Sequence, residues 1–132
     1  MAKSESLPLI SEQDIVAARQ TIRRAAQQVG FSIVDQTKIV TAASELARNA
    51  LVYGGGGILT WEIMSENGRT GLRLTVNDKG PGIKDLALAM KDGWTSGTGL
   101  GLGLPGAKRL VNEFDITSQP GLGTTVTVTR WK

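Results

Sequence analysis

Clusters of glycine divide this chain into segments more clearly than any other residue type does. Of the 17 glycines, 13 lie in four short segments, at residues 54–57, 80–82, 97–106 and 121–123. Glycine weakens the interior of helices and strands, so regular elements are expected between these segments rather than across them. Disorder would scatter glycine among polar residues, but 40% of this chain is hydrophobic. The clusters therefore predict loops that approach a ligand closely, between elements that share one core.

Two amphipathic helices are predicted before the first glycine cluster. Ser11 followed by Asp14 resembles a capping box, and Gly30 ends the helix that it starts. Ser32 and Asp35 repeat the capping pattern for a second helix, which ends at residues 54–57. Apolar residues recur at helical spacing in both segments: Ile15, Ala18, Ile22, Ala25 and Val29, then Ile39, Ala43, Leu46, Ala50 and Tyr53.

The remaining periodic segments predict strands and further helices. Asn67-Gly68 is a hairpin signal, and we expect it within a longer loop. A short helix is expected over residues 84–91. Pro105 is expected in the first turn of a third long helix, which carries Ala107, Leu110, Val111 and Phe114 toward the core. Strands are expected at residues 7–10, 59–63, 72–77, 115–118 and 124–130.

This order of elements predicts the fold class. Helices and hairpins in runs favour an α+β fold, a two-layer sandwich with an antiparallel or mixed sheet covered on one face by helices. With 132 residues the chain fits one domain, taken as residues 1–132.

Composition excludes several classes of function. The chain has no Cys and no His, so thiolate metal sites, disulfides and histidine catalysis are excluded. Residues 1–10 do not form a signal peptide, and no apolar run reaches the ~20 residues of a membrane helix. The basic residues pair only at Arg23-Arg24 and Lys108-Arg109, which is too sparse for nucleic-acid binding. We expect a cytoplasmic protein with no membrane or nucleic-acid partner.

Four polar or glycine-rich motifs carry the candidate chemistry. Glu45 and Asn49 lie four residues apart on the second helix, so they share one face. Such a pair can place a base beside a Mg²⁺ ligand, or it can simply be a solvated helix face. Asp78, followed by Gly80 and Gly82, ends a strand; this carboxylate can accept a hydrogen bond from an adenine amino group, and an ordinary turn is the alternative.

The two later glycine motifs are also open to two interpretations. Residues 97–103 precede the Pro105 helix, and backbone amides at a helix N-terminus bind anions. The G-x-G-x-x-G pattern at residues 101–106 does not open an early βαβ unit, and no Gly-Lys-Ser/Thr motif occurs, so neither a dinucleotide fold nor a Walker A loop is predicted. Thr124, in a Gly-x-Gly-Thr sequence, opens the last strand and can place a hydroxyl near a base or only form a turn.

In this order and spacing, the four motifs resemble the GHKL ATPase signature shared by gyrases, histidine kinases and anti-sigma kinases. The nearest resemblance within that family is to the serine/threonine switch kinases of the stressosome, the RsbT type. It is carried by residues 14–20, 44–49 and 103–110 and by the short segment between Met90 and Gly99. The resemblance implies a Bergerat-type ATP-binding fold, with ATP and Mg²⁺ as cofactors.

The resemblance also implies roles for individual residues. Glu45 resembles the catalytic base, Asn49 the Mg²⁺ ligand and Asp78 the adenine-reading carboxylate. The residues that resemble the rest of the nucleotide site are Gly80, Gly82, Gly99, Leu100, Gly101, Gly103 and Thr124. The motifs do not fix the basic residue that contacts phosphate, for which the candidates are Lys79, Lys91 and Arg48.

The family resemblance extends to partners. It implies an acceptor Ser or Thr on a STAS-domain protein and a PPM-type phosphatase that binding of the kinase activates. Three alternatives remain open: an anti-sigma factor kinase that binds sigma, a non-catalytic nucleotide-binding adaptor, and an ATP hydrolase without a protein acceptor. The residues leave the oligomeric state open, a homodimer included.

Overall fold

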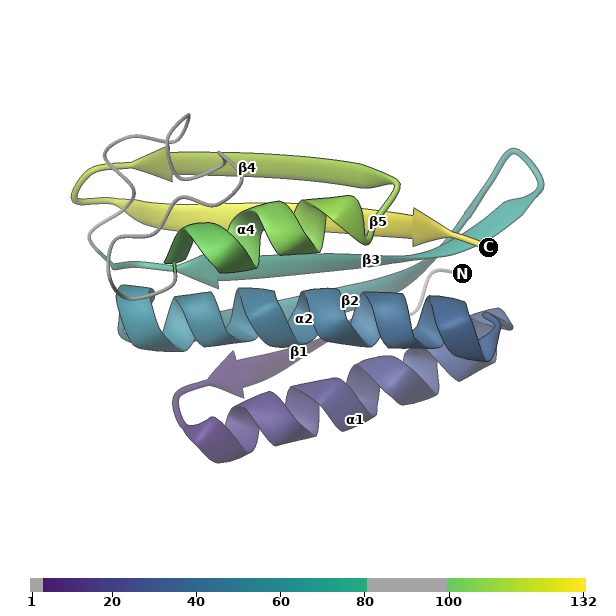
Figure 1. The fold of residues 1–132 in the computed structure, drawn as a ribbon, viewed down its shortest axis with the longest axis horizontal. Helices are drawn as coiled ribbons and strands as arrows, with labels where there is room; N and C mark the ends of the chain where they lie inside the picture. The colour runs from purple at the N-terminus through teal and green to yellow at the C-terminus, as the bar shows by residue number, and fades with distance from the viewer. Residues whose placement is uncertain (1–3, 81–99) are drawn as a thin grey trace.

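The computed structural model describes residues 4–80 and 100–132 (Figure 1). The short helix expected over residues 84–91 lies outside this range. The elements are, in chain order, β1 (Ser4–Leu9), α1 (Glu12–Val29), α2 (Ile33–Gly54), β2 (Gly57–Glu66), β3 (Arg69–Asp78), α4 (Leu100–Arg109), β4 (Glu113–Gln119) and β5 (Gly123–Trp131).

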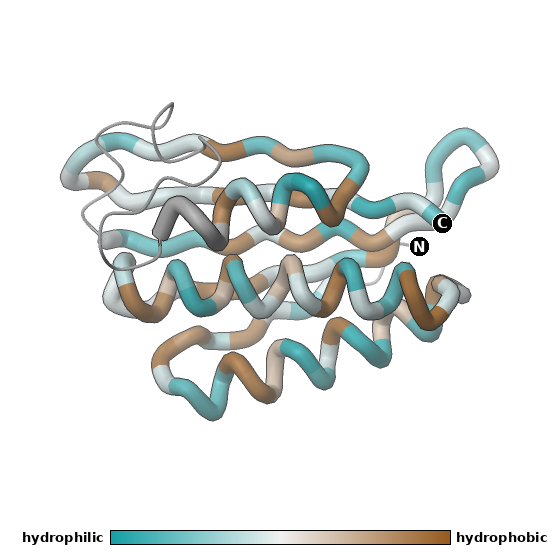
Figure 2. Tube along the Cα trace, viewed as in Figure 1, coloured by the Kyte–Doolittle hydropathy of each residue, from teal (hydrophilic) through white to brown (hydrophobic). Residues whose placement is uncertain are grey.

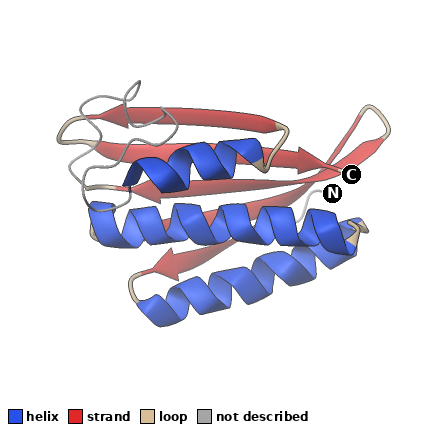
Figure 3. Cartoon of the chain, in the orientation of Figure 1, coloured by secondary structure: helices blue, strands red, loops and turns tan. Residues whose placement is uncertain are grey.

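The strands form one sheet with the order β1-β2-β3-β5-β4. All four pairings among the described strands are antiparallel. The three helices within the described residues lie in a layer over one face of this sheet, and α2 runs between α1 and α4 (Figures 1 and 3). The predicted two-layer α+β sandwich is confirmed, with an antiparallel sheet.

The core lies between the two layers, and strand alternation sends every second residue into it. Hydrophobic and hydrophilic residues alternate along the strands and helices in Figure 2. Leu59, Leu74 and Val128 are fully buried on neighbouring strands, and each such side chain contributes about 1.5–3 kcal/mol to folding. The apolar stripes predicted for the two long helices are buried, except that Tyr53 is only half-buried.

Capping contacts define the helix ends as the sequence predicts. The Asp14 carboxylate accepts hydrogen bonds from the backbone N–H groups of Ile10 at 2.8 Å and Ser11 at 3.1 Å. The Ser32 hydroxyl accepts one from the backbone N–H of Asp35 at 3.1 Å. Gly30 ends α1 in the left-handed region, with φ of 91°.

The turn between β2 and β3 is tighter than predicted. Asn67 and Gly68 have φ of 53° and 78°, as a type I′ turn requires. Glu66 pairs directly with Arg69, so the loop contains only these two residues. The longer loop expected around Asn67-Gly68 is therefore wrong, because both strands extend to the turn.

Helix α4 also differs from the prediction. It begins at Leu100, so Pro105 lies inside the helix instead of in its first turn, and Phe114 belongs to β4. Proline has no N–H, so the carbonyl of Gly101 lacks its usual helical donor. Leu104 is 2% exposed and Ala107 is fully buried. Tertiary packing of these residues holds a helix that its glycines and proline disfavour.

Candidate functional site

One row of residues on the helix-facing side of the sheet differs from the rows beside it. In this row, paired residues across the four strands β2, β3, β5 and β4 are Gly57, Asp78, Thr124 and Ser118. The corresponding residues of the next row toward the middle of the sheet are aliphatic: Leu59, Val76, Val126 and Ile116. Polar groups that face an interior need partners. The polar row therefore marks a place where a polar ligand can bind.

Asp78 lies at the centre of this row and is surrounded by glycine. The backbone N–H of Gly80 donates to its Oδ1 at 2.9 Å. A Cβ atom on Gly54 would collide with the Asp78 carboxyl group, and one on Gly123 would collide with the Asp78 carbonyl. Only glycine at these two positions lets the last turn of α2 and the start of β5 approach Asp78 this closely.

The environment of the Asp78 carboxyl shifts its pKa upward. Burial raises the pKa, while backbone N–H groups of Gly80 and Thr124 oppose the shift by donating to the carboxylate. A half-buried carboxylate with a raised pKa is common at functional sites. A ligand amino group that donates to Asp78 would add a further partner for its charged form.

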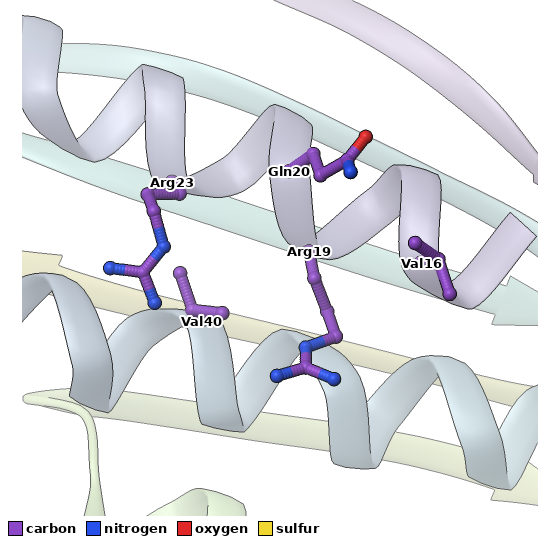
Figure 4. A pocket seen from close by; sticks show the side chains of 5 residues that line it. All are labelled: Val16, Arg19, Gln20, Arg23 and Val40. Carbon is purple, nitrogen blue, oxygen red and sulfur yellow. The ribbon is translucent and has the colours of Figure 1, made fainter.

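The side of α2 toward α4 carries Glu45 and Asn49. Val40 faces α1, since it shares a pocket with α1 residues (Figure 4). Asn49 is nine residues farther along, about two and a half helical turns at 3.6 residues per turn, so it lies on the opposite side of α2. Glu45 lies one turn before Asn49, and both are half-buried. The predicted pair thus shares a face toward α4.

The amide of Asn49 has an unusual environment. Its Nδ2 atom is buried and has no hydrogen-bond partner among the described residues. An amide group can present either its oxygen or its nitrogen in such a position, because the two atoms are exchanged by a flip. The oxygen suits Mg²⁺, which takes one protein ligand together with phosphate oxygens and water. Asn49 therefore fits the metal-ligand role, since ligand binding would satisfy an otherwise unpaired group.

Asn49 and Asp78 lie at opposite ends of the candidate site. Gly54 touches Asp78, and Asn49 is five residues before Gly54 on the same helix. At 1.5 Å per residue, this is about 7–8 Å along the helix axis. Asp78 and Asn49 are therefore separated along the direction of α2, so an extended ligand with unlike ends could contact both.

The basic candidates for phosphate contact fall into three situations. Arg48 makes an exposed ion pair with Glu12 of α1, at 3.5 Å. Lys79 is exposed next to Asp78. Lys91 lies outside the described residues. The Arg48 ion pair ties that side chain to α1, and Lys79 is the described candidate beside the polar row.

The glycine-rich segment is only partly described. Gly82 and Gly99 lie outside the described residues. Leu100, Gly101 and Gly103 are in the first turn of α4, whereas a loop was expected there. Backbone N–H groups in the first turn of a helix have no intrahelical acceptor. This correction keeps their predicted ability to bind an anion, now as part of a helix N-terminus.

Sequence reasoning missed three residues of the site. The cluster at residues 54–57 was predicted to end a helix and to approach a ligand closely, but the contact of Gly54 with Asp78 and the pairing of Gly57 with Asp78 were not predicted. Ser118 had no sequence signal, because its place beside Thr124 depends on the register of β4 and β5.

A pocket lies on the outer side of the helical layer. It measures about 260 Å³ and is lined by Val16, Arg19, Gln20 and Arg23 of α1 together with Val40 of α2 (Figure 4). It is on the other side of α2 from Asn49 and is separate from the polar row. Among the described residues, no helix is both long and apolar enough to cross a membrane.

Comparison with known proteins gives the family of this chain. The family model for "Histidine kinase-, DNA gyrase B-, and HSP90-like ATPase" matches residues 34–132. Serine/threonine-protein kinase RsbT of Bacillus subtilis (strain 168) is 46% identical over 123 residues, which cover 93% of this chain and 92% of that protein. Anti-sigma F factor of Shouchella clausii (strain KSM-K16) is 31% identical over 120 residues, covering 84% and 80%. The chain belongs to the family of histidine kinase-, DNA gyrase B- and HSP90-like ATPases and is homologous to a serine/threonine-protein kinase.

Proposed function

We propose that this chain is a Mg²⁺-dependent serine/threonine protein kinase that acts in a bacterial partner switch. The observation that carries this proposal is the polar row centred on Asp78. Asp78 contacts the C-terminal end of α2, and the same helix carries Glu45 and Asn49. Family membership implies an ATP site, and these groups are suited to contact the adenine base and the phosphates of ATP. The 46% identity to RsbT favours transfer to a protein over simple hydrolysis.

Each residue has a distinct role in this proposal. Asp78 accepts a hydrogen bond from the adenine amino group, supported by Thr124 and shaped by Gly80 and Gly82. Asn49 holds Mg²⁺, which when bound supplies charge neutralisation for the phosphates. The amides of Gly99, Leu100, Gly101 and Gly103 bind the phosphates. Glu45 accepts the proton of the incoming Ser or Thr hydroxyl.

The partners proposed here come from the family. The acceptor is a STAS-domain protein, and the second partner is a PPM-type phosphatase that the released kinase activates. Residues 1–132 act as one kinase domain in the cytoplasm. Anti-sigma F relatives at 26–31% identity support a second candidate, a kinase that also binds a sigma factor. The higher identity to RsbT favours the switch kinase.

Phosphoryl transfer by single-residue variants tests the proposal. Glu45→Ala should keep ATP binding but slow transfer by about 10²–10⁴-fold, as loss of a general base does. Asn49→Ala should weaken Mg²⁺-dependent ATP binding as well. Acceptor proteins are captured from the native cell extract with and without Mg²⁺-ATP, phosphosites are mapped, and transfer is then timed. Glu66→Ala, at the exposed β2–β3 hairpin, is the matched control.

The outcomes separate the candidates. Wild-type rates in Glu45→Ala would disprove the base assignment. ATP turnover without any phosphorylated protein would favour a hydrolase, and ATP binding without turnover would favour an adaptor. Capture of a sigma factor in place of a phosphatase would favour the anti-sigma kinase.

A further inference from the structure

The two edge strands of the sheet differ in their capacity to pair with a further strand. The strand order places β1 at one edge and β4 at the other (Figure 1). Among the described residues, no strand pairs with the outer side of either one. An edge strand presents unpaired N–H and C=O groups, and proteins commonly protect such an edge with proline, lysine or a bulge.

One contact at the end of β5 fixes which backbone groups point outward. The backbone N–H of Lys132, directly after β5, donates to the carbonyl oxygen of Thr70 on β3 at 2.8 Å. Successive residues of an antiparallel strand direct these groups to opposite sides. Even-numbered residues of β5 therefore face β3, and odd-numbered ones face β4. Carried through the register of all four pairings, the even-numbered residues of β1 and of β4 face outward.

β1 is protected at these outward positions, whereas β4 is not. Pro8 is an outward-facing residue of β1 and has no N–H. Its missing donor removes no bond to β2, but it interrupts any strand that would add from outside. The outward-facing residues of β4 include Phe114 and Ile116, and this strand contains no Pro and no Lys. β4 is therefore the edge at which a further strand can add.

The side chains at the start of β4 provide a second, independent feature. A pocket of about 240 Å³ is lined by Arg73, Glu113, Phe114, Asp115, Thr127 and Thr129. Glu113 and Asp115 lie on the sheet face away from the helices, because the residues that alternate with them pack against the core. Glu113 accepts a hydrogen bond from the Trp131 indole N–H at 2.7 Å. Asp115 is exposed, and its carboxylate has no partner among the described residues.

Charge distinguishes the possible occupants of this edge. A second copy would have to offer β1 or β4, and these two strands contain no Lys or Arg between them. Pairing β4 with β4 would bring the carboxylates of two copies close together, and like charges across strands are destabilising. A basic side chain on an added strand can instead enter the pocket beside Asp115.

We infer that the outer edge of β4 binds an extended segment of a partner protein in which basic residues alternate with apolar ones. The added strand pairs in an antiparallel manner with the outward N–H and C=O groups of Phe114 and Ile116. Its basic residues lie on the same face as Asp115, and its apolar residues extend the face that the helices cover. This surface is separate from the proposed ATP site.

A fluorescent peptide of alternating valine and lysine, about seven residues long to match one strand, is the probe. Fluorescence anisotropy should show that the unaltered protein binds it and that Asp115→Lys weakens binding about tenfold, because an attractive cross-strand pair becomes repulsive. Glu66→Lys, the same charge reversal at the exposed β2–β3 hairpin, should bind the peptide as the unaltered protein does. A peptide of alternating valine and glutamate should not bind.

Backbone pairing is tested separately from charge. Amide exchange measured by NMR should show that the peptide protects the N–H groups of Phe114 and Ile116. The N–H of Asp115 faces β5 and should not change. In antiparallel pairing, the valine amides of the peptide face β4 and the lysine amides face away. Methylating the valine amides should therefore abolish binding, whereas methylating the lysine amides should not.

The possible failures are distinguishable. Equal peptide affinity in Asp115→Lys and the unaltered protein, or bound peptide without protection at Phe114 and Ile116, would overturn the inference. Self-association of the chain that Asp115→Lys abolishes would make a second copy the occupant and would also overturn it. Asp115→Lys should bind ATP normally. Absence of ATP binding by the unaltered protein would overturn the proposed function but not this inference.

Discussion

At the scale of single residues, the candidate site is centred on one carboxyl group that is closely packed against glycines. Asp78 is held by the backbone N–H of Gly80 and packed against the last turn of α2. Burial raises its pKa above the usual range, so ionising Asp78 at neutral pH costs folding free energy. Binding function and stability are thus opposed at this residue.

Removing the charge of Asp78 should separate its effect on ATP binding from its effect on folding stability. Asp78→Asn should weaken ATP binding by about 10- to 100-fold, since a hydrogen bond to a charged acceptor is lost, and should reduce the preference for ATP over GTP. Because the raised pKa penalises the charged form, the melting temperature at pH 7 should rise, and this difference should disappear below about pH 4.

Calorimetry and thermal unfolding measure both quantities for Asp78→Asn. Asp115→Asn, the same change at an exposed position of β4, is the control. Equal ATP affinity in Asp78→Asn and the unaltered protein would disprove the adenine-reading role.

Filling the space at Gly54 should affect binding through packing. Gly54→Ala favours the helix intrinsically, by up to about 1 kcal/mol. The added Cβ, however, collides with the Asp78 carboxyl group. We expect ATP affinity to fall about tenfold, corresponding to 1–3 kcal/mol for an overpacked contact.

Calorimetric ATP titration compares Gly54→Ala with Gly106→Ala, where a Cβ would meet no described atom within 4 Å outside the backbone of its own helix. The control should bind ATP normally. Unchanged affinity in Gly54→Ala would mean that Asp78 does not need its present position.

At the scale of elements, α4 is a helix whose first half lacks several intrahelical hydrogen bonds. Its first amides have no intrahelical acceptor, and Pro105 removes the donor for the Gly101 carbonyl. Buried Leu104 and Ala107 anchor the helix to α2 and the core. This end of α4 is therefore where a bound anion would add most to helix stability.

Hydrogen exchange should report this stabilisation. Amides of residues 100–104 should exchange rapidly in the free protein and gain protection with saturating Mg²⁺-ATP, because nucleotide phosphates supply the missing acceptors. The last turn of α1, residues 26–29, lies at the opposite end of the molecule from the start of α4 (Figure 1), so it is the internal control and should not change. If exchange at residues 100–104 stays the same while calorimetry confirms saturation, this helix end does not bind the phosphates.

At the scale of the whole molecule, Arg130 connects three distant segments. From β5 its guanidinium donates to Asp35 in the first turn of α2 at 2.6 Å and to the carbonyl of Leu110, after α4, at 2.9 Å. The Arg130 side chain is 15% exposed. This contact joins both helices that border the candidate site to the sheet.

Acidification should remove the contribution of this contact. The hydrogen bond from Arg130 lowers the pKa of Asp35, so its stabilisation is present above the unfolded-state value near 3.8 and is lost as pH falls through the folded-state value. Asp35→Asn should lower the free energy of unfolding at pH 7 by about 1 kcal/mol and have little effect near pH 2.

Urea unfolding at both pH values measures the Asp35→Asn effect, with Asp115→Asn as the control for removing one negative charge. A stability loss of equal size at pH 7 and pH 2 would exclude the charge of Asp35 as its origin.

The local pattern of the chain determined its elements and most of its candidate residues. Capping residues such as Ser32 and the apolar stripe of α2 act over a few residues, so helix starts and buried faces were predictable. Motif order was enough to predict the family, and it named Asp78, Asn49 and Thr124 as candidates. The alternation of strand residues predicted which sheet face is buried.

Only the tertiary structure decided which residues from different elements lie next to one another. Strand register aligned Ser118 with Thr124 and Asp78, although these residues come from three different strands. The contact of Gly54 with Asp78 needs α2 docked on the sheet, which no local pattern specifies. The start of α4 at Leu100 likewise depends on burial of its later residues, since its own glycines and Pro105 disfavour a helix. Long-range packing, which short sequence windows do not contain, is the physical reason for each of these features.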